Sequence, residues 1–239
     1  MLAKSIRCDS EGLGIVKTKV TPSATSIGNR PKTSKSQKGL SSKSSKTTPI
    51  GGSRKILGPS FYNRRADSVA RELLGCWLIV QRGKRYQEKH CIFETEAYLG
   101  PHDLACHGRT GPTPRNRTMF GPAGHWYVYL CYGMHWMLNI VTGREGLPAA
   151  VLLRGAGESV GPGRLTKMLG VTKQHDGRRA NSVTGLWIEG GGGVPRRQIQ
   201  RTPRIGVDYA KEWAKRPLRY IVDPNIFEMR SVITEGSYQ

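Results

Sequence analysis

Short apolar runs separated by Gly, Pro and charged residues recur from residue 58 onward, and most are typical of strands. CWLIVQ (76–81) predicts a buried strand, and the turn GKR leads from it into a second strand around residues 91–98. Residues 126–141 predict an aromatic hairpin with Gly133 at its tip. Further strands are expected at AAVLLR (149–154), LWIE (186–189) and PLRYIV (217–222).

Only two segments have helical spacing. ADSVARELLG (66–75) places Val69, Leu73 and Leu74 on one stripe, with Asp67 or Ser68 as the cap and Gly75 as the stop. GPGRLTKMLG (161–170) begins with Gly-Pro and continues with helical spacing. Residues 100–124 and the Gly run 190–193 are predicted as loops. Because most connections are too short for crossover helices, we expect an α+β fold: a single domain around a curved, mostly antiparallel β-sheet with flanking short helices.

Charge divides the chain into two parts. Residues 1–57 hold 12 Lys and Arg against Asp9 and Glu11, a net of +10, and residues 58–239 hold 26 against 15, a net of +11, which together give +21. Because the first part is rich in Ser and Lys and has no aromatic residue, we predict a disordered basic tail at 1–57 and a folded domain at 58–239. The tail fits a polyanion tether or an inert linker better than a transit peptide, which would favour Arg over Lys.

The cysteines and the apolar runs indicate the compartment. Five cysteines leave one unpaired and include no CxxC pair, so a reducing compartment is expected rather than a secreted disulfide framework. No apolar signal segment opens the chain, and the longest apolar run, 126–141, is too short and too interrupted to span a bilayer. These features predict a soluble protein that is not secreted.

Two acids stand out in the strand at 91–98. Alternation sends Glu94 and Glu96 to one face, and Tyr98, His102, Asp103 and His107 follow closely. One interpretation is an edge strand whose two Glu side chains face water. Residues 126–139 favour a site instead, because Tyr127 and Tyr129 share one face of the next hairpin and the surrounding chain is basic. Stacking aromatics, acids and a basic surface are the combination expected where a nucleobase is bound and altered.

Residues 94–141, which begin ETEAYLGPHDLACHGRTG and end CYGMHWMLNIV, resemble the alkyladenine (3-methyladenine) DNA glycosylases. Further similarity follows at AAVLLR, at GPGRL (161–165) and at RIGVDYAKEWAKRPLRY (204–220), so the resemblance covers roughly residues 58–225. It implies an α+β fold and a monofunctional base-excision enzyme without a cofactor. The implied substrate is double-stranded DNA containing damaged purines: 3-methyladenine, 7-methylguanine, hypoxanthine or ethenoadenine.

The resemblance also implies roles for individual residues. Glu96 is expected to be the general base, and Arg154, with the backbone carbonyl near Ile205, to help hold the attacking water. The flipped base is expected to lie among side chains of five residues: Tyr98, His107, Tyr127, Tyr129 and Asn139. The backbone N–H of His107 would donate to purine position 6, and Asn139 would obstruct the 2-amino group of guanine. The side chains expected to fill the gap in the duplex are Tyr132, Met134 and Met119.

The residues themselves suggest the phosphate contacts. The loop at 100–124 carries Arg109, Arg115 and Arg117, and Arg164 lies at the start of the helix at 161–170. Cations and a helix N-terminus suit phosphate oxygens. We expect the protein to act as a monomer, in the nucleoid-associated cytoplasm if it is bacterial and in the nucleus if it is eukaryotic.

Two alternatives remain open. A zinc site could be drawn from five residues, although their spacing matches no standard finger: His102, Cys106, His107, His125 and Cys131. We expect no metal. A non-catalytic protein could also use the aromatic residues to bind nucleic acid. No Lys lies in the segments around Glu96, His107, Tyr132 or Asn139, so a lyase reaction through an amine is not expected.

Overall fold

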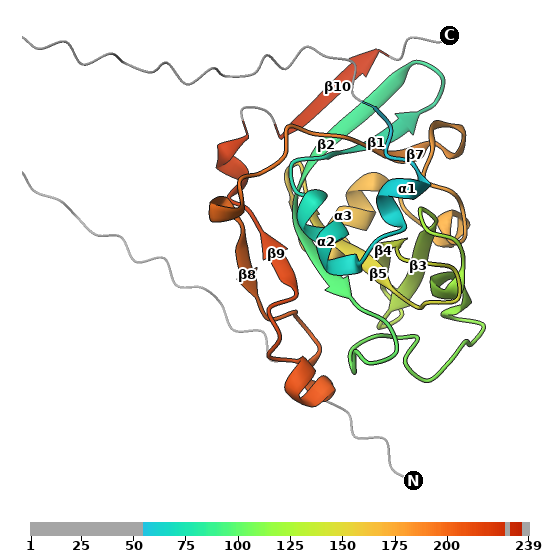
Figure 1. Ribbon diagram of the computed structural model, residues 1–239. Helices are drawn as coiled ribbons and strands as arrows, with labels where there is room; N and C mark the ends of the chain where they lie inside the picture. The colour runs from blue at the N-terminus through green and yellow to red at the C-terminus, as the bar shows by residue number, and fades with distance from the viewer. Residues whose placement is uncertain (1–54, 228–229, 236–239) are drawn as a thin grey trace, which may run out of the picture. The chain divides into compact units, whose positions relative to one another are not determined.

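The computed structural model describes residues 55–227 and 230–235, so residues 1–54 of the predicted tail at 1–57 lie outside the described part (Figure 1). The helices there are α1 (Pro59–Tyr62), α2 (Ala66–Glu72) and α3 (Pro162–Leu169). The strands are β1 (Trp77–Arg82), β2 (Tyr86–Tyr98), β3 (Trp126–Cys131), β4 (His135–Val141), β5 (Ala150–Ala156), β6 (Ser159–Val160), β7 (Leu186–Glu189), β8 (Gln200–Thr202), β9 (Arg219–Ile221) and β10 (Ser231–Glu235). Short 3₁₀ turns are found at Arg117–Phe120, Lys173–His175, Ser182–Thr184, Arg196–Gln198, Asp208–Trp213 and Pro224–Ile226.

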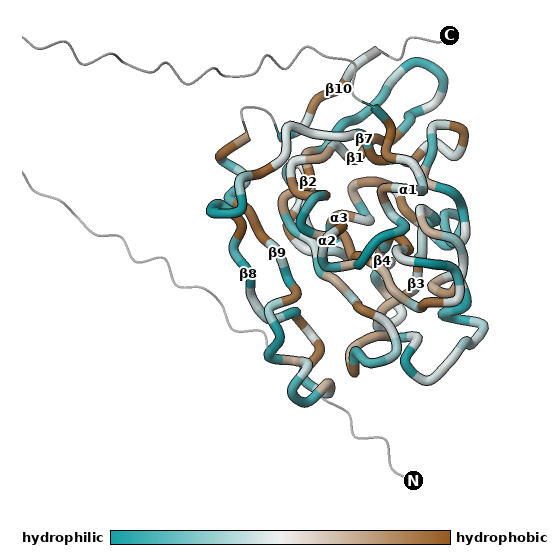
Figure 2. The backbone as a smooth tube through the Cα atoms, viewed as in Figure 1, coloured by the Kyte–Doolittle hydropathy of each residue, from teal (hydrophilic) through white to brown (hydrophobic). Residues whose placement is uncertain are grey.

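The strands form one sheet with the order β3-β4-β5-β2-β1-β7, to which β6, β8, β9 and β10 are added. Every pairing among the described strands is antiparallel, which confirms the predicted α+β fold. In Figure 2 the turn that joins β1 to β2 is hydrophilic, whereas β1 itself is largely hydrophobic. No helix in the described part of the chain is long and apolar enough to cross a membrane.

Strand β2 organises the sheet because both of its edges are paired along most of its length. Its first half lies between β1 and β10, and its second half lies between β5 and β9. The register against β5 shifts on both sides of Glu94, where the strand bulges. The interpretation of an edge strand with water-facing acids is therefore wrong. Glu94 is 3% exposed and Glu96 is fully buried.

The two faces of the sheet differ in what covers them. Helix α2 packs on β2 and β5, and α3 packs on β4 and β5. The side chains that alternate toward these helices are apolar, among them Val128, Leu138, Ile140, Val151 and Leu153. Thr95 also points this way, and its hydroxyl donates to the Ala70 carbonyl of α2 at 2.9 Å. The neighbouring residues in the same strands point to the opposite face, which carries the candidate site.

The structure differs from two local expectations. Helix α2 begins at Ala66 after Arg65, so neither Asp67 nor Ser68 is its cap; Asp67 lies in the first turn and accepts from the Ser68 N–H at 2.9 Å. The short strands β6, β8 and β10 were not predicted. At the end of the predicted tail, Ile56 bridges to Glu189 and the Leu57 N–H donates to the Ile188 carbonyl at 2.9 Å.

Candidate active site

The Glu96 carboxylate lies fully buried on the face of the sheet opposite α2 and α3, within reach of three donors. The Ile205 backbone N–H donates to Oε1 at 2.9 Å, and the Tyr98 hydroxyl donates to Oε2 at 2.9 Å. The Arg154 guanidinium lies 3.3 Å from Oε1. Because each carboxylate oxygen can accept more than one hydrogen bond, the carboxylate keeps acceptor capacity for a water molecule.

Burial raises the pKa of Glu96. This rise is opposed by four groups: the charge of Arg154, the Ile205 N–H, the Tyr98 hydroxyl and the charge of Arg204. A carboxylate with a raised pKa is a stronger base once it is ionised, as a general base requires. The pKa of Tyr98 is raised well above its ordinary value, mainly by burial and by Glu96, so its hydroxyl keeps the proton that it donates.

Glu94 holds the arginines instead of facing water. Its Oε1 accepts from the Arg154 Nε at 2.9 Å and from the Arg219 Nε at 2.7 Å. The predicted shared face of the two acids is therefore confirmed, and Arg154, which ends the apolar run of β5, bridges them. This division of contacts distinguishes the two carboxylates, since Glu94 is occupied by cations and Glu96 mainly by neutral donors.

Beside Glu96, six side chains enclose a narrow cavity: Tyr98, His107, Met119, Tyr127, Tyr129 and Asn139. The rings of His107 and Tyr129 meet edge to face with centroids 4.6 Å apart, and the His107 Nδ1 lies 3.1 Å from the Tyr127 hydroxyl. The structure thus brings together all five residues predicted for the base pocket. The enclosed space is about 10 Å³, room for about one water molecule, so a purine can enter this space only when side chains move.

Two polar groups of residues that line the cavity differ in their hydrogen-bond partners. No described residue accepts a hydrogen bond from the His107 backbone N–H, while the His107 carbonyl accepts from the Asn116 side chain at 2.9 Å. Asn139 is buried, and its amide donates to the carbonyls of Tyr127 and Met137 at 3.0 and 3.2 Å. The Asn139 side chain is therefore held in place in the wall of the cavity.

The hairpin tip presents exposed apolar side chains. Tyr132 is 85% exposed and Met134 is 71% exposed. Tyr132 and Gly133 both adopt positive φ, at 50° and 68°, and the Met134 N–H donates to the Cys131 carbonyl at 3.1 Å, which closes a tight turn. A left-handed Tyr costs free energy and the exposed ring buries no apolar surface, so this tip is not explained by the stability of the fold.

Met119, which was predicted to fill the gap in the duplex together with the tip, lines the cavity. It is 2% exposed and packs with Cys106 and Tyr127, because the turn at Arg117–Phe120 directs it inward. Its role toward the duplex stays a prediction.

The predicted phosphate contacts are all exposed. Arg109, Arg117 and Arg164 are exposed, and the charge of Arg109 lies close enough to Tyr209 to lower the pKa of its hydroxyl against the effect of burial. Arg115 donates to the Leu130 carbonyl at 2.8 Å and lies 5.6 Å from the Tyr129 ring centroid, so it also supports the hairpin.

Sequence reasoning named Asp103 near the two acids without giving it a role, and it missed Arg204 and Arg219. Arg204 and Asp103 form a buried ion pair behind Tyr98, and Arg219 holds Glu94. Arg204 and Arg219 lie within the segment at 204–220 that carries part of the resemblance, which was the available signal. Their partners lie 101 and 125 residues away, so no local pattern connects them.

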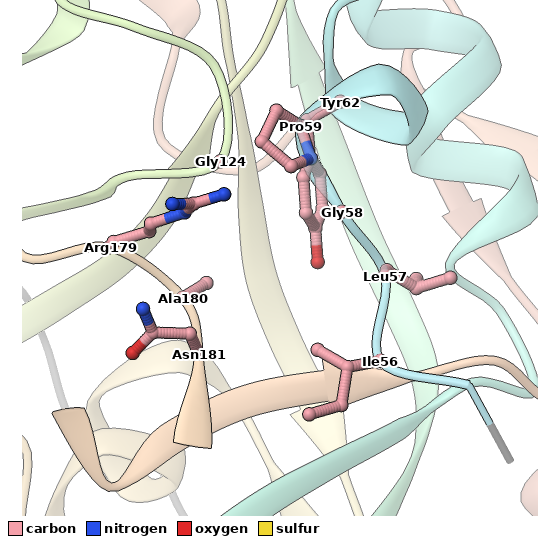
Figure 3. A pocket seen from close by; sticks show the side chains of 9 residues that line it. All are labelled: Ile56, Leu57, Gly58, Pro59, Tyr62, Gly124, Arg179, Ala180 and Asn181. Carbon is pink, nitrogen blue, oxygen red and sulfur yellow. The ribbon is translucent and has the colours of Figure 1, made fainter. Parts of the chain in front are cut away.

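A larger cavity of about 270 Å³ lies elsewhere in the domain (Figure 3). The polar side chains that line it are those of Tyr62, Arg179 and Asn181, and the Tyr62 hydroxyl has no hydrogen-bond partner among the described residues. This cavity has no carboxylate that could activate water. Across residues 55–227 and 230–235, no three His, Cys, Asp or Glu side chains are arranged to hold a metal ion, so the grouping drawn from His102 to Cys131 does not form there.

Comparison with known proteins connects this arrangement to one family. The family model described as methylpurine-DNA glycosylase matches residues 60–160 and 158–226. A protein of Myxococcus xanthus named as a 3-methyladenine DNA glycosylase is 51% identical over 173 residues, which are 68% of this chain and 88% of the relative. Proteins with the same name from Anaeromyxobacter sp. and Legionella pneumophila (strain Paris) are 45% and 43% identical, and the matched regions cover 73% and 72% of this chain and 93% and 96% of those relatives.

Proposed function

Because this chain belongs to the methylpurine-DNA glycosylase family, and is thus a monofunctional DNA glycosylase for alkylated bases, we propose how it acts. It flips a damaged purine out of duplex DNA and hydrolyses the N-glycosidic bond with a water molecule that Glu96 activates. The proposed substrates are 3-methyladenine, 7-methylguanine, hypoxanthine and ethenoadenine. The observation that carries this proposal is the buried Glu96 carboxylate, held by three donors directly beside the aromatic cavity. The relatives compared are bacterial, so the DNA acted on would be that of a bacterial nucleoid.

Flipping is supported by the division of the hairpin between two environments. Strand β3 of the hairpin contributes Tyr127 and Tyr129 to the cavity, and the hairpin tip presents Tyr132 and Met134 to solvent. A target base stacked in a duplex is shielded, and its extrusion costs a few kcal/mol. The Tyr132 ring would offset part of this cost by filling the gap in the duplex, while the exposed arginines bind the phosphates.

In the chemical step, the water oxygen bonds to the anomeric carbon while the Glu96 carboxylate takes a proton from the water. The bond between the anomeric carbon and the purine nitrogen breaks, and its electron pair leaves with the base. A cationic alkylated base departs as a neutral molecule and needs no acid, whereas hypoxanthine must gain a proton as it leaves. The ionised Glu96 carboxylate also stabilises the positive charge that develops on the sugar.

Release of free base decides between this proposal and a protein that only binds. Duplexes that each carry one lesion are incubated with the wild-type protein and with Glu96→Gln, and the released bases are separated and measured. The expected result is release by the wild type, an intact backbone until alkali or heat is applied, and no covalent adduct with borohydride. Binding without release would show a non-catalytic protein. A stoichiometric adduct would show that an amine, not water, is the nucleophile.

A further inference from the structure

The Asp103–Arg204 ion pair is fully buried and joins three parts of the chain. The Arg204 guanidinium donates to both Asp103 oxygens, at 2.6 and 2.8 Å, and to the Ala97 carbonyl of β2 at 2.8 Å. Asp103 in turn accepts from the backbone N–H groups of Leu99 and Ala105, at 3.0 Å each. The pair therefore fixes the end of β2, the start of the loop at 100–124, and the segment that follows β8.

The same pair lies directly behind two of the donors to Glu96. Ile205, whose backbone N–H donates to Oε1, is the next residue after Arg204. The Arg204 guanidinium also lies 4.7 Å from the centroid of the Tyr98 ring, whose hydroxyl donates to Oε2. Arg154 approaches Glu96 independently, from β5. A change in the Arg204 position would thus displace both neutral donors and leave the third unaffected.

Stability alone explains this pair poorly. A buried ion pair is often no better for stability than apolar residues of the same volume. Here the Arg204 Nε is buried without a hydrogen-bond partner among the described residues, which adds a cost. A buried polar group that remains unsatisfied calls for another reason, and the two donors to Glu96 supply one.

We propose that Asp103 and Arg204 are positioning residues for base excision: they hold the Ile205 N–H and the Tyr98 hydroxyl on the Glu96 carboxylate. The proposal rests on the proposed function of Glu96 as the general base. Neither residue touches the reacting atoms, and each acts through groups that touch Glu96.

Loss of the Asp103–Arg204 pair is expected to change the pKa of Glu96 in one direction only. The Ile205 N–H, the Tyr98 hydroxyl and the Arg204 charge all lower the pKa of Glu96 against the effect of burial, so loss of the pair raises that pKa further. Excision requires ionised Glu96, and the acid limb of the rate profile therefore moves to higher pH. The substitutions keep the other charged or titratable groups around Glu96, which are Arg154 of β5, Glu94 of β2, Arg219 of β9 and Tyr129 of β3, whereas the Tyr98 hydroxyl of β2 is expected to move away from the carboxylate.

The test uses Asp103→Asn/Arg204→Gln, which leaves no unpaired charge in the buried site. Single-turnover excision of ethenoadenine is measured across pH, together with binding of the lesion duplex. We expect the acid limb to move up by about half a pH unit or more and the rate at neutral pH to fall about tenfold or more, with binding largely kept. A folded double variant with the wild-type acid limb overturns the proposal.

If the double variant does not fold, Arg204→Lys is measured, because it keeps the charge and loses the bidentate contact. We expect a smaller shift of the acid limb in the same direction. An unshifted acid limb in this variant overturns the proposal.

Arg82→Gln is the matched control. Arg82 is also a partly buried arginine that joins elements, since it donates to Glu88 at 2.9 Å and to the carbonyls of Met168 and Leu169 at 3.0 and 3.1 Å. None of these groups contacts Glu96. The control should lower thermal stability without moving the acid limb, and an equal shift in the control would show that any loosening of the fold suffices.

A second readout separates this inference from the proposed function. If the wild-type protein released no base, the proposed function would fail, whereas the positioning of Glu96 can be measured without activity. The ¹³C carboxyl resonance of Glu96, assigned by its loss in Glu96→Gln, is titrated in the wild type and in the double variant. A higher pKa in the variant supports the positioning role, and an unchanged pKa overturns it.

Discussion

The two faces of the sheet are built by alternate residues of the same strands, and they make opposite demands on the fold. In β4, Leu138 points into the core under α3, while Asn139 points into the aromatic cavity. In β5, Leu153 lies in the core and Arg154 lies between two buried acids. The core face gains stability by removing apolar surface from water. The site face instead buries charges, which is costly unless each is paired.

The site face offsets this cost only in part. Glu94 is fully engaged by Arg154 and Arg219, and Asp103 by Arg204. Glu96 is different, because burial still dominates its environment and its pKa remains raised. The fold thus pairs the acids that support the site with arginines, and leaves less stabilised Glu96, the acid that is proposed to take up a proton. Substitutions on the two faces should therefore have separable effects on activity and on stability.

The largest expected effect is on the site face. Glu96→Gln should lower base excision by at least ~10²-fold, the usual scale for a positioned general base, while binding of the lesion duplex is kept. Single-turnover excision and equilibrium binding measure the two quantities. Near-normal excision by this variant would move the role of general base to Glu94 or elsewhere.

On the core face, Leu138→Ala should lower the free energy of unfolding by about 2–5 kcal/mol, because a fully buried side chain is replaced by a cavity. Chemical denaturation measures the loss. The folded fraction should excise with the wild-type pH profile, since Leu138 faces away from Glu96. A displaced pH profile would show that the two faces are not separable.

A smaller effect is expected at the hairpin tip, which belongs to neither face. Tyr132→Ser should weaken the flipped complex by about 1–3 kcal/mol, the usual value of one aromatic stacking contact, and should leave thermal stability unchanged because the ring is 85% exposed. Fluorescence of a flipped base analogue measures the extent of flipping. Excision of tightly paired lesions should suffer more than excision of mispaired ones, and Tyr132→Phe should retain the wild-type behaviour. Equal losses of excision on both kinds of duplex would count against the proposal that the Tyr132 ring fills the gap left by the flipped base.

The sequence predicts the core face better than the site face, for a physical reason. Alternation over β3 and β4 is local, so the hairpin, its tip and the shared face of Tyr127 and Tyr129 could be predicted. The contacts of β2 with β9 and β10 are not local, and a strand with two acids was therefore open to interpretation as an edge. The Asp103–Arg204 pair likewise joins residues 101 positions apart, which no periodicity reveals. The burial of Met119 could not be predicted either, because a single 3₁₀ turn decides whether a loop side chain points inward.

The smallest expected effect is a stability difference whose sign follows from the raised pKa of Glu96. In the unfolded chain this carboxyl ionises near its ordinary pKa of about 4.3, and in the folded protein it ionises at a higher pH. Between these two pKa values the folded state binds more protons than the unfolded state, so the stability contributed by Glu96 is present at low pH and is lost as the pH rises. Glu96→Gln removes the ionisation. The variant should therefore be more stable than the wild type at neutral pH, and the difference should shrink as the pH falls toward the unfolded pKa. Thermal unfolding of both proteins across this range measures the difference. If the wild type were the more stable protein at neutral pH, the pairing of Glu96 with its three donors would outweigh its burial, and the site face would be as well satisfied as the core.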